Sequence, residues 1–205
     1  MLIRLTPSLV IKSSWRPYRA GPGETVLTVR SRSAFPPGHP TTRLCLELLV
    51  GAAAKFSGKR LLDVGCGSGI LALAGAALGA AFCVGVDLSW PAARLSRENA
   101  GENRLAGAVQ VLRGSTECLG GLFQALVANL PPGVQLDKTA EFTRLAAPDG
   151  ILILSGFKDT QEEPLDRPYR EAGWSLSRRL TKDEWVIDLP PEQSFTWVAW
   201  LLERR

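Results

Sequence analysis

The stretch LLDVGCGSG, residues 61–69, predicts a buried strand that runs directly into a glycine-rich turn and then a helix. Gly65, Gly67 and Gly69 stand at every second position, where the missing Cβ permits positive φ and close approach of the backbone to a ligand. Helix-forming residues follow from 70 to 78. We therefore predict that this turn binds a nucleotide-containing cofactor, with the site drawn from Asp63, Gly65, Cys66, Gly67 and Gly69.

A second anchor ends the next apolar run. Residues 81–86 read as a strand, and Asp87 follows about twenty residues beyond the central glycine. An acidic side chain at this spacing caps the ribose of a bound nucleotide. We predict that Asp87 and its neighbour Leu88 belong to the same site.

The order of these residues separates the motif from the dinucleotide-binding fingerprint. The glycines form G-x-G-x-G after an acid, whereas a dinucleotide fold uses G-x-G-x-x-G and seats a pyrophosphate on the helix N-terminus. An acid just before the glycines would repel phosphate, so we expect a cationic or zwitterionic ligand. S-adenosylmethionine fits, because its sulfonium and ammonium groups favour carboxylates and its ribose diol suits Asp87. Glycines that serve only the packing of strand against helix are the alternative.

Composition indicates one α/β domain with a sizeable core. The chain has 205 residues, of which 45% are apolar, and a mean hydropathy of +0.05. The longest apolar run, 44–54, is interrupted by Glu47 and is too short to span a bilayer, so we expect a cytoplasmic protein without an export or membrane segment. Four scattered cysteines without a C-x-x-C pair favour reduced thiols over disulfides or zinc, and a single histidine argues against a metal site.

Basic charge is concentrated at the front of the chain. Residues 1–60 hold ten Lys or Arg against two acids, whereas the remainder holds fourteen against eighteen. This surface could contact RNA or an acidic partner, or it could be an ordinary solvated face, since only Trp15 and Tyr18 interleave with the cations. The basic residues concerned are Arg4, Lys12, Arg16, Arg19, Arg30 and Arg32.

The element pattern divides the chain into a basic β preamble over 1–33 and a main domain over 34–205. Short strands are predicted at 2–5, 9–14 and 25–30, too few for a core of their own. A helix is predicted over 41–54, capped by Thr41 or Thr42. From there the pattern alternates, with strands at 61–64, 81–86, 109–112 and 122–128 and helices at 70–78 and after Ser89. Alternation of this kind predicts a parallel sheet with helices on both faces.

The last third of the chain completes the sheet. A helix is predicted over 134–147, ended by Pro148-Asp149-Gly150, then a strand at 151–154 and an irregular helix at 161–172. Alternating residues at 174–179, 184–189 and 195–202 predict strands that form an antiparallel edge.

Asn129 lies where the strand at 122–128 ends and is followed by Leu130, Pro131 and Pro132. Because ligands in open α/β sheets sit beyond the carboxyl ends of the strands, we expect Asp63, Asp87 and Asn129 to converge on one crevice. An amide there can accept from an amine and donate to a ligand. A simple Asn-x-Pro-Pro turn is the alternative.

Transfer of a methyl group from a sulfonium needs mainly an uncharged, desolvated nucleophile held in line. No Ser-His-Asp set can be drawn, because the one histidine is His39 in a proline-rich loop. His39 either covers the cofactor and helps deprotonate an amine, or makes ordinary hydrogen bonds. Trp90 packs over an adenine or under the following helix, and residues 115–117 are placed where an adenine amino group could be bound.

Together these residues resemble class I S-adenosylmethionine-dependent methyltransferases, and more narrowly the ribosomal-protein methyltransferase family PrmA. The resemblance runs from about Ala34 to Leu189 and is carried by HPTTRLCLELL (39–49), LLDVGCGSGILALAGAALGA (61–80), GVDLSWPAARLSRENAGEN (85–103), ALVANL (125–130) and LILSGF (152–157). It implies a Rossmann-like fold with a mostly parallel seven-stranded sheet, and S-adenosylmethionine as cofactor. It places Thr42, Gly65, Asp87 and Asn129 at cofactor contacts. Family members methylate N-terminal and lysine amino groups of a large-subunit ribosomal protein, and Asn129 would lie next to the accepting nitrogen.

Two features depart from the family pattern. The loop before HPTT reads Ala34-Phe35-Pro36-Pro37-Gly38, where the family is rich in glycine and threonine. The family also carries a separate N-terminal substrate-recognition domain, for which we expect no room in this chain. Methylation of a nucleobase or glutamine nitrogen is a second hypothesis, although its usual N-P-P-Y form is replaced here by Asn129-Leu130-Pro131-Pro132. A cofactor-binding protein without turnover is the third.

Overall fold

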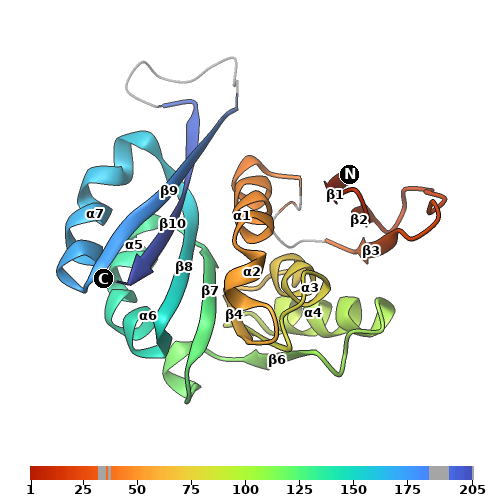
Figure 1. Ribbon diagram of the computed structural model, residues 1–205, viewed down its shortest axis with the longest axis horizontal. Helices are drawn as coiled ribbons and strands as arrows, with labels where there is room; N and C mark the ends of the chain where they lie inside the picture. Colours follow the sequence, from red (N-terminus) through yellow and green to blue (C-terminus); the bar gives the residue numbers. More distant parts are fainter. Residues whose placement is uncertain (32–35, 37, 185–193, 205) are drawn as a thin grey trace.

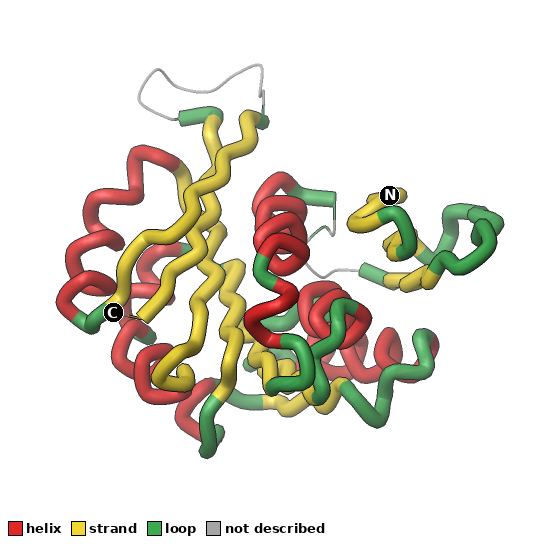
Figure 2. Tube along the Cα trace, in the orientation of Figure 1, coloured by secondary structure: helices red, strands yellow, loops and turns green. Residues whose placement is uncertain are grey.

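The computed structural model describes residues 1–31, 36, 38–184 and 194–204. It contains a seven-stranded sheet and a separate three-stranded sheet near the N-terminus (Figures 1 and 2). The strand order of the large sheet is β6-β5-β4-β7-β8-β10-β9. Its strands are β4 (Arg60–Val64), β5 (Phe82–Asp87), β6 (Val109–Arg113), β7 (Phe123–Asn129), β8 (Ala146–Lys158), β9 (Trp174–Asp183) and β10 (Thr196–Arg204).

Five neighbouring strands of this sheet, β6 to β8 in the spatial order, are parallel. β10 runs antiparallel between β8 and β9, so the last strand of the chain lies inside the sheet and β9 forms its edge. This arrangement confirms the predicted mostly parallel sheet with an antiparallel C-terminal edge. Of the strand predicted over 184–189, residues 185–189 lie outside the described residues.

Helices cover both faces of the large sheet (Figure 1). Along each central strand alternate residues enter two different apolar clusters, so that Leu61 packs in one cluster and Leu62 in the other. The first cluster lies under α1 (Pro40–Gly51), α2 (Ala53–Phe56), α3 (Ile70–Ala77) and α4 (Trp90–Glu102). The second lies under α6 (Thr139–Leu145) and α7 (Glu162–Glu171), next to α5 (Pro132–Asp137).

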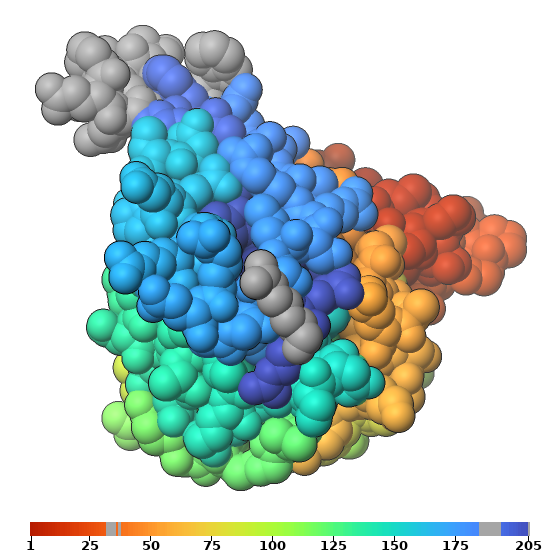
Figure 3. Space-filling view, turned by 60° about the vertical axis from the view of Figure 1, so that its left-hand side comes forward, coloured from red at the N-terminus to blue at the C-terminus, as the bar shows by residue number. Residues whose placement is uncertain are grey.

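The N-terminal sheet contains β1 (Leu2–Thr6), β2 (Leu9–Ser13) and β3 (Thr25–Val29). β2 pairs antiparallel with β1 and parallel with β3. The N-terminal sheet protrudes beside α1 in the space-filling view (Figure 3). Its inward side chains do not form a core of their own, as predicted, because they are buried in the cluster that also holds α1 and α3; they are Leu9, Ile11, Leu27 and Val29.

The helix predicted over 134–147 is wrong in two respects. It is divided at Lys138 into α5 and α6, and the carbonyl of Gln135 accepts from the hydroxyls of Thr139 and Tyr169. It also ends at Leu145, because β8 begins at Ala146. Residues 147–150 form an irregular excursion in β8 opposite β7, so the predicted Pro-Asp-Gly stop lies inside a strand.

The predicted cap of α1 is also wrong. Thr41 and Thr42 lie inside the helix, and the cap is His39, whose ring nitrogen Nδ1 accepts from the backbone N–H of Thr41 at 3.3 Å. A histidine can cap in this way because its neutral ring has a free acceptor nitrogen. Among the described residues, no helix is long and apolar enough to cross a membrane.

Candidate functional site

The glycine turn after β4 has positive φ at Gly65, Gly67 and Gly69, at 69°, 54° and 78°. A Cβ at Gly65 would lie 2.5 Å from Leu130 Cδ2, and one at Gly69 would lie 2.2 Å from Ser96 Oγ. A Cβ at Gly67 would face open space, with the nearest atom 3.9 Å away. The positive φ favours glycine at all three positions, and Leu130 and Ser96 lie against Gly65 and Gly69, whereas the space in front of Gly67 is open to a ligand.

Asp87 at the end of β5 is joined to this turn by hydrogen bonds. Its Oδ2 accepts from the backbone N–H of Gly67 at 2.9 Å, and its Oδ1 accepts from the N–H of Ser89 at 2.8 Å. A carboxylate offers about four acceptor sites, so two are left for the hydroxyls of a ligand. The structure thus holds the predicted ribose acid against the predicted cofactor turn.

A small hollow of about 40 Å³ opens between the turn, α1 and the end of β7, and is lined by Thr42, Gly65, Cys66, Gly67, Ser68, Ile70, Leu71 and Asn129. It brings together five of the residues predicted from sequence. Ile70 and Leu71 begin α3, where backbone N–H groups have no carbonyl four residues earlier to bond. The hollow therefore combines helix-terminal donors with the side chains of Thr42 and Asn129.

Asn129 lines the hollow and carries a buried acceptor that has no partner among the described residues. Its Nδ2 donates to Thr42 Oγ1 at 3.4 Å, while its Oδ1 is buried and unbonded. A buried acceptor without a donor costs about 1–3 kcal/mol. Such an atom at the carboxyl edge of the sheet is what a ligand that donates hydrogen bonds would satisfy.

Asp63 does not face the hollow. The residue is 1% exposed, and its Oδ2 accepts from the N–H of Ala72 in the first turn of α3 at 3.0 Å. Burial raises the pKa of Asp63 to about 7, against the lowering effect of the Ala72 hydrogen bond. The predicted convergence of three strand-end groups is therefore seen for Asn129 and, through Gly67, for Asp87, while the Asp63 carboxyl lies beneath the helix.

The segment after Asn129 is held by β8 and α5. Leu130 donates its N–H to the carbonyl of Ser155, and Gln135 Nε2 donates to the carbonyls of both residues at 2.6 and 2.8 Å. Gly156 has φ 102°, and a Cβ there would lie 2.3 Å from the carbonyl oxygen of Leu130. Sequence reasoning missed Gln135 and Gly156; the glycine in LILSGF was the one available signal.

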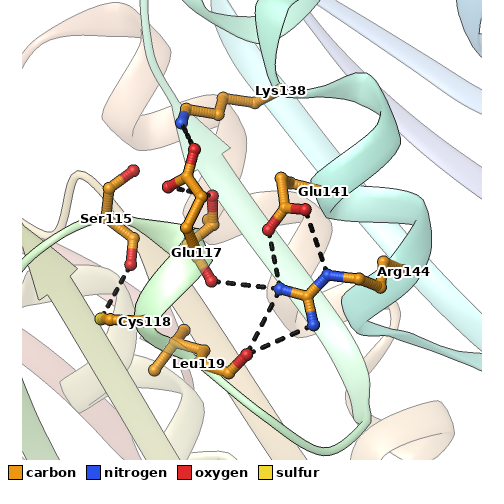
Figure 4. Close-up of polar contacts among 8 residues, drawn as sticks. Ser115, Glu117, Cys118, Leu119, Lys138, Glu141 and Arg144 are labelled. Atoms are coloured by element: carbon orange, nitrogen blue, oxygen red, sulfur yellow. Dashed lines mark hydrogen bonds and ion pairs between the residues drawn. The ribbon is translucent and has the colours of Figure 1, made fainter.

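The turn after β6, predicted to bind adenine, is braced from α5 and α6 (Figure 4). Lys138 bonds the carboxylate of Glu117, which lowers the pKa of Glu117 to about 2. Arg144 donates to the carbonyls of Thr116 and Leu119 at 3.3 Å and pairs with Glu141 at 2.7 Å. The short helix η1 (Thr116–Cys118) is thereby fixed in place, and its adenine contact stays a prediction.

Three further candidates lie around the site. His39, which caps α1, also packs edge-on to Trp197, with the ring centroids 4.9 Å apart. Its ring lies 3.7 Å from the Glu184 carboxylate. Burial lowers the pKa of His39, which favours the neutral ring. Trp90 is half exposed at the start of α4, with the Arg97 guanidinium 5.6 Å from its ring centroid. Leu88 beside Asp87 is 73% exposed.

The family described as ribosomal protein L11 methyltransferase (PrmA) matches residues 3–188 of the chain. The chain belongs to the PrmA family. The match begins at residue 3, so it includes the N-terminal sheet that lay outside the predicted resemblance. A ribosomal protein L11 methyltransferase of Syntrophotalea carbinolica is 36% identical over 184 residues, covering 89% of this chain and 60% of the relative. The chain thus spans about 60% of the length of this PrmA relative.

Solved structures share the fold. A ribosomal protein L11 methylase from Lactobacillus delbrueckii subsp. bulgaricus superposes with a TM-score of 0.81 at 23% identity, covering 100% of this chain and 97% of that one. Magnesium protoporphyrin IX methyltransferase from Synechocystis PCC 6803, solved with bound S-adenosylmethionine, gives 0.59 at 19% identity, covering 77% and 76%. These similarities confirm the Rossmann-like methyltransferase architecture of the PrmA-family chain.

Proposed function

We propose that this chain is an S-adenosylmethionine-dependent N-methyltransferase acting on amino groups of a protein. The observation that carries the proposal is the buried, unbonded Oδ1 of Asn129 beside the glycine turn. Membership of the PrmA family and the names of its relatives support the same activity.

The residues present fit the cofactor. Gly67 leaves open space in front of the turn, Asp87 keeps free acceptor positions for a ribose diol, and the first N–H groups of α3 suit a carboxylate. The cofactor supplies an electrophilic methyl group on its sulfonium. We assign Thr42, Gly65, Cys66, Gly67, Gly69, Asp87, Leu88 and Asn129 to its binding, and Asp63 to fixing the turn from behind.

Asn129 is the residue that we assign to the amine. Its Oδ1 can accept a hydrogen bond from the N–H of an uncharged amino group, which orients the nitrogen lone pair toward the hollow. Thr42 on α1 accepts from Nδ2 and so holds the amide, while the oxygen stays unbonded. Transfer to an amine in line needs positioning more than acid-base catalysis, which agrees with a site whose one histidine caps a helix.

A protein amine suits this site better than a flat nucleobase or amide. The side chain of Leu130, which lies over Gly65, is aliphatic. The position of the aromatic residue in N-P-P-Y is taken by Pro132, the first residue of α5. Relatives named for ribosomal protein L11 suggest a ribosomal protein as acceptor, and hence a cytoplasmic location.

Part of the basic charge near the N-terminus is already neutralised, because Arg4 pairs with Glu24 and Arg30 pairs with Glu102.

Two measurements test the proposal. Calorimetry with S-adenosylmethionine should show binding, and absence of heat at millimolar ligand would remove every enzymatic hypothesis. Labelled-methyl transfer into a lysate, treated with protease or with RNase, should then lose its label with protease alone. Loss with RNase alone would instead assign the acceptor to RNA and overturn the protein-amine assignment.

A further inference from the structure

The outer edge of β3 is paired with side chains instead of with another strand. Asn103, which caps the C-terminus of α4, accepts from the N–H of Thr28 at 2.7 Å and donates to its carbonyl at 2.8 Å. Asn99, one turn earlier, accepts from the N–H of Arg30 at 3.0 Å and donates to its carbonyl at 2.9 Å. Two amide side chains thus take the place of a neighbouring strand along this edge.

The spacing of the two elements explains the match. Four residues of helix advance by about 6 Å, and two residues of strand by about 6.7 Å. Asparagines four apart at the C-terminal end of α4 therefore reach the backbone groups of Thr28 and Arg30, which are two apart at the end of β3 and lie on the same edge of the strand. Glu102 on the same helix pairs with Arg30 at 2.9 Å and reinforces the contact.

The two asparagines differ in their third hydrogen bond. Asn99 Nδ2 also donates to the carbonyl of Ser68 in the glycine turn at 2.8 Å, whereas Asn103 Nδ2 donates to the carbonyl of Asn99 within its own helix at 2.7 Å. Asn99 is fully buried, and both of its N–H groups and its oxygen are bonded. One side chain therefore joins three segments that are far apart in the sequence.

We propose that Asn99 is a positioning residue that makes the N-terminal sheet part of the cofactor site. The Ser68 carbonyl that it holds belongs to the peptide between Ser68 and Gly69, two peptides along the same turn from the Gly67 N–H that bonds Asp87. Ser96, one turn earlier on α4, packs against Gly69, where its Oγ occupies the space that a Cβ would need. The N-terminal sheet is then linked to the glycine turn through the Asn99 side chain, and loss of that link loosens cofactor binding. This inference rests on the proposed function.

Asn99→Ala and the matched control Asn103→Ala separate this role from ordinary stability. Both variants lose contacts to β3, so both should melt at a lower temperature. We expect backbone amides of residues 65–73 to exchange with deuterium at least fivefold faster in Asn99→Ala than in Asn103→Ala. The dissociation constant for S-adenosylmethionine should rise about tenfold in Asn99→Ala and stay within twofold of wild type in Asn103→Ala.

Equal exchange at 65–73 in the two variants overturns the proposal. If Asn99→Ala does not fold, the full wild-type chain provides the test, because coupling between two sites is reciprocal. Saturating S-adenosylmethionine should then slow exchange of the Thr28 and Arg30 amides in the N-terminal sheet, and unchanged exchange there overturns the proposal. A wild-type chain that binds no cofactor contradicts the proposed function, while the comparison of exchange between variants still decides the role of Asn99.

Discussion

Gly67 donates its backbone N–H to the carboxylate of Asp87 at 2.9 Å, so the glycine turn and the acid that ends the neighbouring strand form one unit. The bond spans twenty residues of sequence and crosses from β4 to β5 at the carboxyl edge of the sheet. A substitution at Asp87 therefore acts on a ligand in two ways, by removing acceptors for its hydroxyls and by freeing the turn.

Asp87→Ala should raise the dissociation constant for S-adenosylmethionine by about 10- to 100-fold, which corresponds to about 1.4–2.8 kcal/mol. Asp87→Asn keeps one oxygen acceptor, so its dissociation constant should lie between those of Asp87→Ala and wild type. Calorimetry measures both. Asp149→Ala, at the opposite end of the sheet strands, is the control and should bind like wild type; equal affinities of Asp87→Ala and this control contradict the assignment.

Asn129→Ala should reduce turnover at least 100-fold while the affinity for S-adenosylmethionine changes by less than about threefold, because the free Oδ1 is assigned to the acceptor amine. Thr42→Val removes the hydroxyl that fixes the amide and should give a smaller loss of turnover. Initial rates of labelled-methyl transfer, measured beside calorimetric affinities, test the separation. Unimpaired turnover in Asn129→Ala would remove its catalytic role.

Asp63 predicts a pH dependence of stability. Its folded-state pKa of about 7 lies above that of an exposed carboxyl, about 3.9. Its contribution to the free energy of unfolding is therefore fully present below about pH 4 and is lost as the pH rises through 7. Asp63→Asn keeps an acceptor for the Ala72 N–H without the ionisation. The free energy of unfolding, measured in urea, should rise in Asp63→Asn relative to wild type between pH 5 and pH 8. A difference in this free energy that does not change with pH would contradict burial as the cause.

Gly156→Ala should destabilise the protein by about 2–4 kcal/mol and displace the segment after Asn129, because a Cβ there collides with the Leu130 carbonyl at a φ that L residues rarely adopt. Gly101→Ala is the matched control. Gly101 lies inside α4 with nothing near its Cβ position, so alanine should stabilise the protein by about 0.5–1 kcal/mol. Thermal unfolding distinguishes the opposite signs; a neutral Gly156→Ala would contradict the packing described.

Regular elements could be predicted because their signals are local. Apolar runs of strand length, followed by helix formers, gave β4, α3 and β5 within one or two residues, and Ser89 was expected to precede α4, which it caps. The division between α5 and α6 could not be predicted, since it accompanies hydroxyl contacts to the Gln135 carbonyl, one of them from Tyr169 on a distant helix. The irregular start of β8 likewise depends on its register with β7.

The site residues could be predicted where residue type and spacing alone indicate the chemistry. Residue type and spacing predict the three glycines, Asp87 and Asn129 as site residues, the family resemblance adds Thr42, and the hollow brings most of them together. The depth of Asp63 could not be predicted, because a carboxyl at a strand end can point to either side of the turn. Asn99 was missed because its partners are backbone groups in two other segments, and backbone contacts leave no mark in the sequence of the partner.

The place of β10 between β8 and β9 bears on how the molecule is assembled. β9 is made before β10, yet within the described part of the chain its one neighbour in the sheet is β10, so it has no native edge to join when it leaves the ribosome. Until β10 arrives, the backbone donors and acceptors along β9 must be satisfied by water, and the Trp174 ring rests on α6 through its bond to Thr143. At this edge of the sheet, β9 can therefore pair only after β10 has been made, although β9 is synthesised first. A chain interrupted before Thr196 would lose β10 and, with it, the pairing of β9.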